Sequence, residues 1–169
     1  MMIRQLDEFD ASIYRRLRLE ALEKVPEAFS ASYEEEKEYS FDITKERLSK
    51  ENIFTFGAFV NEKLVGTVTL IQETKRKLQH RGTIVAMYVA LEHRGLGIGE
   101  KLVKQAIKKG TELQEMKQIY LAVASTNRPA KELYTKLGFK TYGVDKRAML
   151  VDGDYYDEDL MVLVLPESN

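Results

Sequence analysis

Three glycines alternate with apolar residues at one place in this sequence, between a strand-like segment and an amphipathic one. The segment runs Arg94-Gly95-Leu96-Gly97-Ile98-Gly99. Backbone N–H groups in such a turn, together with the free donors at the start of the next helix, can surround a phosphate whose charge the helix dipole favours. Glycine has no Cβ to block this approach, and Arg94 adds a guanidinium that can bind a phosphate oxygen. The segment therefore predicts an anion site.

The spacing of the glycines narrows the class of ligand. It is Gly-x-Gly-x-Gly, whereas dinucleotide-binding folds use Gly-x-Gly-x-x-Gly with an acidic residue on a second strand, which is missing here. No Gly-Lys-Ser or Gly-Lys-Thr occurs, so the turn is not a P-loop. It matches the pattern Arg/Gln-x-x-Gly-x-Gly/Ala. A tight strand-to-helix turn without any ligand is the alternative interpretation of the glycines by themselves.

The composition excludes several other kinds of chemistry. The 169 residues include 26 Lys and Arg, 27 Asp and Glu and no cysteine, and 44% are hydrophobic. A cysteine nucleophile, disulfides, thiolate zinc sites and iron–sulfur sites are therefore excluded. The two histidines, His80 and His93, lack the spacing of a metal site, so we expect no metal. The balanced charge predicts no nucleic-acid partner, because such proteins usually carry a basic excess.

The chain reads as a single domain without a membrane partner. No segment approaches the roughly 18 apolar residues needed to cross a bilayer, and the N-terminus lacks the apolar region of a secretory signal. We therefore expect a cytoplasmic protein. No repeat, low-complexity tract or proline-rich linker divides the sequence, so residues 1–169 predict one domain with one core.

The elements before the glycine turn are expected to be strands and two helical regions. Residues 3–6 predict a short strand, followed by a helix that Asp10 caps and Pro26 ends. Residues 33–50 predict a second, highly charged helix or helix-loop with an acidic start. Three apolar runs predict strands, the first two as an antiparallel hairpin: residues 53–60, 64–71 and 83–89.

After Gly99 the hydrophobic pattern changes to the period of a helix with lysines on its opposite face. Asn127 is expected to cap a later helix, which Gly138 ends. Three further strands are expected, the last two around a turn at 151–154: residues 119–123, 139–150 and 159–165. Mixed strands and helices in this order predict an α/β domain with one central sheet.

The chain resembles the GNAT superfamily of acyl-CoA-dependent N-acyltransferases over nearly its whole length. The resemblance rests on two motifs in the expected order and distance. These are Met87-Tyr88-Val89 with the glycine turn, and further on Asn127, Ala130, Leu133-Tyr134 and Leu137-Gly138-Phe139. The segment from Val151 to Met161 also resembles one bacterial branch of that superfamily. The resemblance implies a single domain with a mixed, mostly antiparallel central sheet of six to seven strands, flanked by about four helices.

The resemblance also implies roles for individual residues. The backbone of Met87, Tyr88 and Val89 would hydrogen-bond the pantetheine arm of acetyl-CoA in the manner of an added strand. The turn that would hold the pyrophosphate consists of Arg94, Gly95, Leu96, Gly97, Ile98 and Gly99. Asn127 would contact the pantetheine region as well as capping its helix. The Tyr134 phenol would point at the CoA sulfur; a core aromatic is the alternative, since Tyr134 lies on the apolar face of its helix.

Direct acetyl transfer to an amine defines what the remaining groups must do. A phenol with a reference pKa of about 10 can donate a proton to the departing thiolate, whose conjugate acid has a pKa of about 8.5. The attacking amine must be neutral, because an alkylammonium has no lone pair, so a base or a water relay is required. Many relatives carry a glutamate before the Tyr-Val pair, but residues 84–87 here contain no carboxylate. Ordered water, a backbone carbonyl, Glu35 and Glu73 remain open as the base.

The resemblance places the acceptor cleft between the region that joins the first two helices and the loop that joins the last two strands. Both regions are acidic and aromatic, which favours a cationic amine such as a polyamine, an amino-sugar antibiotic or a lysine-bearing peptide. The residues concerned are Tyr33, Glu34, Glu35, Glu36, Asp152, Asp154, Tyr155, Tyr156, Asp157, Glu158 and Asp159. Solvated charge at a helix start and in a turn is the alternative.

The expected function is transfer of an acetyl group from acetyl-CoA directly to a primary amine of a small molecule or peptide. The absence of cysteine disfavours an acetyl-cysteine relay and so favours the direct route. The alternative is a CoA-binding sensor or pseudoenzyme without acyl transfer, which the missing strand carboxylate suggests. A homodimer, common in the resembled superfamily, is a further possibility that no residue here indicates.

Overall fold

The computed structural model describes residues 1–167, and their secondary structure alternates between strands and helices. The strands are β1 (Met2–Gln5), β2 (Ile53–Val60), β3 (Lys63–Gln72), β4 (Arg81–Val89), β5 (Gln118–Ala124), β6 (Lys140–Val151) and β7 (Asp154–Val164). The helices are α1 (Ala11–Lys24), α2 (Tyr33–Glu36), α3 (Phe41–Ser49), α4 (Ile98–Glu112) and α5 (Arg128–Lys136). Single 3₁₀ turns lie at Glu8–Asp10, Pro26–Ala28 and Leu91–His93.

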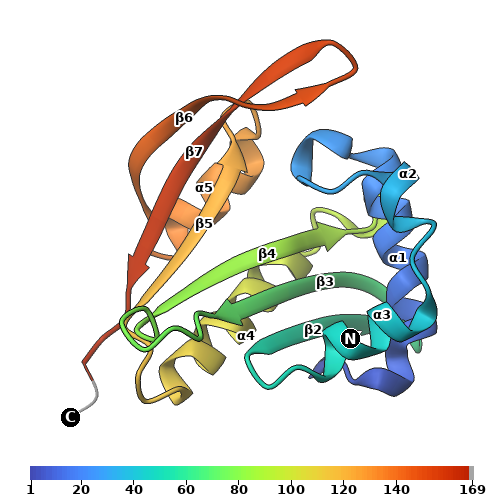
Figure 1. Ribbon diagram of the computed structural model, residues 1–169, viewed down its shortest axis with the longest axis horizontal. Coiled ribbons are helices and arrows are strands. Elements are labelled where there is room, and N and C mark those ends of the chain that lie inside the picture. The colour runs from blue at the N-terminus through green and yellow to red at the C-terminus, as the bar shows by residue number, and fades with distance from the viewer. Residues whose placement is uncertain (168–169) are drawn as a thin grey trace.

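All seven strands form one sheet, in the order β1-β2-β3-β4-β5-β7-β6, with helices on both faces (Figure 1). Neighbouring strands are antiparallel except β4 and β5, which are parallel. The mixed, mostly antiparallel sheet predicted from the sequence is therefore confirmed. Within residues 1–167, no helix is both long enough and apolar enough to cross a bilayer.

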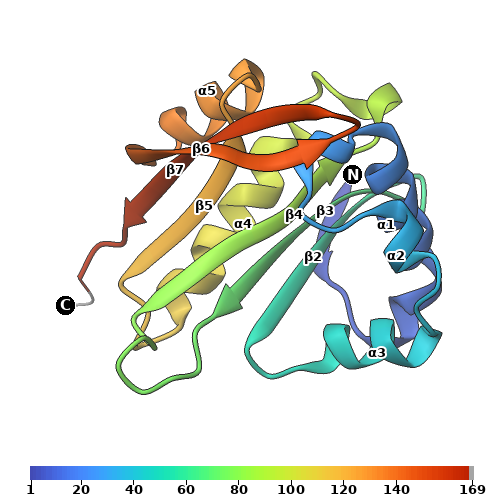
Figure 2. The ribbon, with the colours of Figure 1, turned by 45° about the horizontal axis from the view of Figure 1, so that its top comes forward.

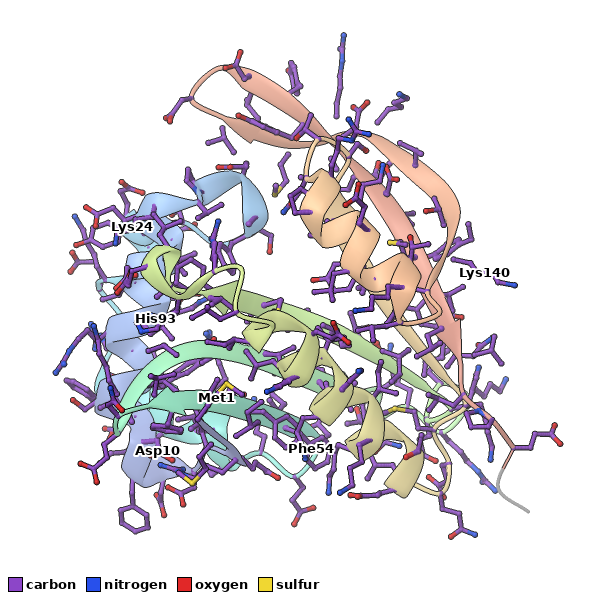
Figure 3. All side chains as sticks on the ribbon, turned by 180° about the vertical axis from the view of Figure 1, so that it is seen from behind. Met1, Asp10, Lys24, Phe54, His93 and Lys140 are labelled. Carbon is purple, nitrogen blue, oxygen red and sulfur yellow. The ribbon has the colours of Figure 1, made fainter. Side chains whose placement is uncertain are left out.

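Two apolar clusters hold the helices to opposite faces of the sheet. Helix α4 buries Leu102, Val103 and Ala106 completely, within the cluster that also contains the inner side chains of β2 to β5. Figure 3 shows α4 and α5 on this face. Helix α1 buries Tyr14 and Leu17 in the other cluster. Burying one such leucine side chain contributes about 1.5–3 kcal/mol, so these stripes fix the helices on the sheet.

Strands β4 and β5 separate after a short paired region, and this opening positions the candidate site. Their pairing runs from Arg81↔Gln118 only to Thr83↔Tyr120. Beyond that point β4 continues with β3 as far as Val89, and β5 continues with β7 as far as Ala124. The two strands diverge in Figure 1. As a result, the β4 edge from residue 84 to 89 faces β5 without a strand partner.

A β-bulge bends β4 within this open stretch. The register with β3 passes from Thr69↔Val85 to Thr67↔Tyr88, and Ala86 adopts a φ of +54°. The Thr67 hydroxyl donates a hydrogen bond to the Ala86 carbonyl at 3.4 Å. The sequence predicted an uninterrupted strand, because an alanine gives no sign of a left-handed conformation. Bulges of this kind change the direction of a strand beside functional sites.

The charged region at residues 33–50 forms two helices, so the prediction of one continuous helix is wrong and that of a helix-loop is closer. Helix α2 has only four residues and begins with a capping box between Ser32 and Glu35. The Lys37 carbonyl then accepts a hydrogen bond from Arg15 of α1 at 2.8 Å, and α3 begins at Phe41. A tertiary contact with α1 thus holds the chain where the helix stops.

Asp10 does not cap α1, contrary to the prediction. Its carboxylate accepts hydrogen bonds from both terminal nitrogens of Arg4, each at 2.7 Å, and from the Asp7 N–H at 3.0 Å. The ion pair to β1 occupies both oxygens, so neither reaches the first turn of the helix. Asp10 instead fastens the strand to the start of the helix.

Strands β6 and β7 form a long hairpin that extends toward the α1–α2 region (Figure 2). Its turn lies at Asp152 and Gly153, which both have positive φ, as the sequence predicted for this turn. The sequence predicted that the last strand begins at residue 159, but β7 begins at Asp154. The prediction was late because the acidic and aromatic residues at 154–158 lack the apolar pattern of a buried strand. Strand β6 also contacts the 3₁₀ turn at Pro26–Ala28, so the hairpin closes over one side of the β4–β5 opening.

Candidate active site

A cavity of about 550 Å³ lies at the opening between β4 and β5. Its walls come from β2 to β5, from α1, α2, α3 and α5, from β7 and from residues 28–31. Its ionisable side chains are Tyr14, Arg18, Glu36, Arg47, Tyr134 and Glu158, and the Asn127 amide and the hydroxyls of Ser30, Thr69 and Thr83 also line it. Residues from most of the chain length therefore meet at one place, which is the arrangement of a binding site.

Tyr134 lines this cavity from α5. The side chain is 6% exposed, and its ring meets Phe139 edge to face with centroids 5.8 Å apart. Burial raises the pKa of the Tyr134 phenol to about 12. The hydroxyl therefore keeps its proton at neutral pH and is able to donate it.

The glycine turn leaves open space before the first turn of α4. Gly95 and Gly97 have φ values of +76° and +72°, in the left-handed region that favours glycine. A Cβ added at either position would meet no atom within 4 Å. Leu96 between them is exposed. The turn thus presents free backbone next to a helix N-terminus, as an anion site requires.

Arg94 is held in place by the strand that precedes the turn. Its Nε donates a hydrogen bond to the Val89 carbonyl at 3.0 Å, and its guanidinium lies 5.7 Å from the centre of the Tyr88 ring. The inner nitrogen is thus already bound to protein. The two outer nitrogens are the ones left to meet an anion at the turn.

Met87, Tyr88 and Val89 lie on the unpaired edge of β4, but only Met87 lines the cavity with its side chain. The Tyr88 hydroxyl instead donates a hydrogen bond to Glu20 of α1 at 3.1 Å. Burial, and to a smaller extent the Glu20 carboxylate, raise the pKa of Tyr88 to about 12. What this segment can offer a ligand in the opening is its backbone.

Asn127 caps α5 and lines the cavity, as the sequence predicted for the cap. Its Oδ1 accepts a hydrogen bond from the Ala130 N–H at 3.2 Å. The amide N–H groups are not used in that bond. Asn127 can therefore serve as cap and donate to a ligand at the same time.

Of the acidic and aromatic residues expected around the acceptor, Glu36 and Glu158 line the cavity. Asp157 binds Lys146 at 3.0 Å and the Arg147 N–H at 2.9 Å, and Asp159 binds Lys131 at 2.8 Å. The cavity lining does not include the others: Tyr33, Glu34, Glu35, Asp152, Asp154, Tyr155 and Tyr156. The predicted acidic surface thus reaches the cavity through two carboxylates.

Glu36 is neutralised by two arginines. Arg18 of α1 donates to it from Nε at 3.1 Å and from Nη2 at 2.8 Å, and Arg47 of α3 lies 3.6 Å away. Burial alone would raise the pKa of the Glu36 carboxyl, but the two guanidiniums outweigh burial and hold it below its usual range. Such a carboxylate is a poor proton acceptor.

The two carboxylates considered for the base from sequence both lie outside the cavity. Glu35 is engaged in the capping box with Ser32, and Glu73 follows the end of β3. From the sequence, Glu158 is one member of an acidic run at residues 152–159, and only the fold shows that it is the member of that run that lines the cavity. Among residues 1–167 no group of three His, Asp or Glu is placed to hold a metal ion.

Residues 18–139 match the family model described as the Acetyltransferase (GNAT) family. The chain belongs to the GNAT family. In this GNAT domain the glycine turn, the open β4 edge and Tyr134 all lie within the matched residues, and the β4 edge and Tyr134 line the cavity whereas the turn does not. The resemblance stated from the two motifs is confirmed.

Two curated proteins that are similar in sequence to this GNAT chain are named as acetyltransferases. The streptothricin acetyltransferase of Escherichia coli is 31% identical over 119 residues, which are 70% of this chain and 66% of that protein. An N-alpha-acetyltransferase of Sulfurisphaera tokodaii is 36% identical over 89 residues, 53% of this chain. The chain spans half the length of this archaeal relative.

Solved structures share the fold along the full chain. A putative acetyltransferase from Salmonella typhimurium, solved with its cofactor acetyl-CoA, superposes with a TM-score of 0.86 at 18% identity and covers 100% of this chain and 96% of its own. A ribosomal-protein-alanine N-acetyltransferase from Brucella melitensis gives a TM-score of 0.84 at 21% identity, with 98% and 100% covered. At these identities the likeness concerns the fold.

Proposed function

We propose that this chain is an N-acetyltransferase that moves an acetyl group from acetyl-CoA directly to a primary amine of a small molecule or peptide. The observation that carries the proposal is a cavity lined both by the unpaired edge of β4 and by the buried phenol of Tyr134. A strand edge can bind an extended ligand through its backbone, and a phenol can protonate a leaving group. Membership of the GNAT family supports both assignments.

The residues present fit acetyl-CoA. The open edge at Met87, Tyr88 and Val89 offers backbone donors and acceptors to an amide-bearing arm, and the turn from Arg94 to Gly99 offers free N–H groups and open space to a pyrophosphate. Asn127 lines the same cavity, and its amide nitrogen makes no hydrogen bond to the part of the chain that the structure describes. The co-substrate supplies a thioester, and these residues bind and orient it.

Tyr134 acts as the general acid in this proposal. When the amine attacks the thioester carbonyl, the carbon–sulfur bond breaks and charge develops on sulfur. A phenol held protonated by burial can donate to that sulfur, and general acid catalysis of this kind contributes about 10²–10⁴ in rate. The chain contains no cysteine, so the acetyl group passes to the amine without a protein thioester.

Of the two carboxylates that line the cavity, Glu158 is the one that would attract a cationic acceptor. Glu36 is already matched by Arg18 and Arg47, so it adds little attraction for an ammonium group. Streptothricin and spermidine acetyltransferases occur among the curated relatives, the latter from Vibrio cholerae at 29% identity over 103 residues. These names support a cationic amine as the first class of acceptor to test.

The decisive experiment is release of free thiol from acetyl-CoA with a panel of polyamines, aminoglycosides, amino acids and peptides. The proposal expects amine-dependent release with at least one class. Background release across the panel, together with a rise in the melting temperature on adding CoA, would instead favour a CoA-binding sensor. A cytoplasmic location and a homodimer remain further proposals; fractionation of cells and light scattering on the purified chain would test them.

A further inference from the structure

Glu158 differs from Glu36, the other carboxylate that lines the cavity, in how its charge is matched. Glu36 is held by two guanidiniums, whereas the Glu158 side chain makes no hydrogen bond or ion pair with another side chain among residues 1–167. Glu158 is half-buried. Its carboxylate is therefore open to the cavity and available to a ligand or a water molecule there.

The register of β7 places Glu158 on the cavity side. Side chains alternate along a strand, and the neighbours Asp157 and Asp159 are bound to Lys146 and to Lys131 of α5. Glu158 therefore projects to the opposite face. It stands across from Ala124 of β5, whose methyl group leaves space beside the end of the β4–β5 opening.

A second carboxylate faces Glu158 from β6. Asp145 is its direct partner in the antiparallel register, and like charges in this position oppose each other. Burial, and then the charge of Asp145, raise the pKa of the Glu158 carboxyl. The other ionisable side chains that line the cavity come from α1, α2, α3 and α5: Tyr14, Arg18, Glu36, Arg47 and Tyr134. The effect is a carboxylate with greater affinity for a proton.

We propose that Glu158 is the general base that removes a proton from the acceptor ammonium, by direct contact or through one water molecule. The inference rests on the proposed acetyl transfer and deepens it. Glu158 lines the same cavity as Tyr134 and as residues 84–87 of the open β4 edge, along which the proposed thioester arm would lie. The acceptor class is therefore a primary amine that is protonated in solution.

The step balances with these two groups. Glu158 takes one proton from the ammonium and passes it to solvent. The neutral nitrogen bonds to the thioester carbonyl carbon, the carbon–sulfur bond breaks, and the electron pair leaves on sulfur, which takes the proton of Tyr134. The nitrogen loses its second proton as the amide forms, and this proton restores the phenol. The sum is ammonium plus thioester giving amide, thiol and one proton.

The test is the pH profile of kcat/KM for Glu158→Gln, measured with the best amine of the panel. Gln keeps the size of the side chain but cannot accept the proton. We expect kcat/KM to fall by about 10²–10⁴ and the acidic limb of the profile to disappear, while KM for acetyl-CoA stays within about twofold of wild type. Glu112→Gln is the matched control at the exposed end of α4, and it should keep the wild-type profile.

Asp145→Asn supplies a second readout that does not alter Glu158 itself. Removing the facing charge lowers the pKa of Glu158, so the acidic limb should move to lower pH while the plateau of kcat is kept. This variant decides the matter if Glu158→Gln fails to fold.

If the wild type is active and Glu158→Gln keeps the wild-type rate and acidic limb, Glu158 is not the base. The proposed function stands in that case. An unmoved acidic limb in Asp145→Asn leads to the same conclusion. A wild type without acyl transfer overturns the proposed function and this inference together.

Discussion

Replacing Tyr134 with phenylalanine removes one oxygen from the cavity and leaves the rest of the site in place. The ring is 6% exposed and packs edge to face on Phe139, contacts that phenylalanine keeps. The hydroxyl makes no hydrogen bond to protein among the residues that the structure describes. We therefore expect a variant that folds normally and lacks only the proton donor.

The magnitude follows from the role of the phenol. General acid catalysis contributes about 10²–10⁴ in rate, which corresponds to about 3–5 kcal/mol of transition-state stabilisation. Because no internal hydrogen bond is lost, the free energy of unfolding should change by less than about 0.5 kcal/mol. The pKa of about 12 keeps Tyr134 protonated, so the wild-type profile should show no limb from this group at neutral pH.

The assay is thiol release at saturating acetyl-CoA, with thermal melting of the same samples. Tyr134→Phe should lower kcat within that range and leave KM for acetyl-CoA within about threefold. Tyr142→Phe is the matched control, since this exposed tyrosine of β6 lies outside the cavity. Full activity in Tyr134→Phe would refute the general acid, and a large loss in both variants would show that the assay reports instability.

Three other substitutions test the ion pair, the turn and the cap. Glu36→Ala leaves Arg18 and Arg47 without their carboxylate and should cost about 3–5 kcal/mol in chemical denaturation; an unchanged midpoint would contradict this. Because the folded pKa of Glu36 lies below its usual value, its contribution to wild-type stability is complete above about pH 4.5 and is lost as the pH falls further, a loss that Glu36→Ala should not show. Gly97→Ala places a methyl group in the open space of the turn, so KM for acetyl-CoA should rise at least about tenfold, with about 1–2 kcal/mol of strain from the positive φ; equal KM values would remove the turn from the cofactor site. Asn127→Ala should cost about 1 kcal/mol as a lost cap and also raise KM for acetyl-CoA, and a stability loss with unchanged KM would leave the cap as its whole role.

Features that depend on local backbone chemistry were predictable from sequence. Gly95, Gly97 and Gly138 all have positive φ, and the hairpin turn lies at Asp152–Gly153. Glycine adopts the left-handed region without a steric cost, so its position announces a turn or a helix end. The amphipathic period of α4 and the Asn127 cap are equally local. These elements were placed within one or two residues.

Features that depend on partners far along the chain were not predictable. Asp10 has the residue type of a cap, yet the Arg4 guanidinium takes its carboxylate. Ala86 enters the left-handed region because β4 must bulge against β3, and nothing in an alanine announces that. The region at 33–50 divides where Arg15 of α1 binds the Lys37 carbonyl. Tertiary contacts overrode local preference in each case.

The residues of the candidate site also fall into those that the sequence predicted and those that only the fold revealed. The sequence by itself determined the glycine turn and pointed to Tyr134 as a candidate, because two motifs carry them as continuous segments. The tertiary structure decided which of many carboxylates could serve the acceptor. Glu36 lies in the cavity but is matched by arginines from two helices, whereas Glu158 lines the cavity opposite Asp145 and has no cationic partner among residues 1–167. Strand register and long-range ion pairs set this distinction, and both join residues that are distant along the chain.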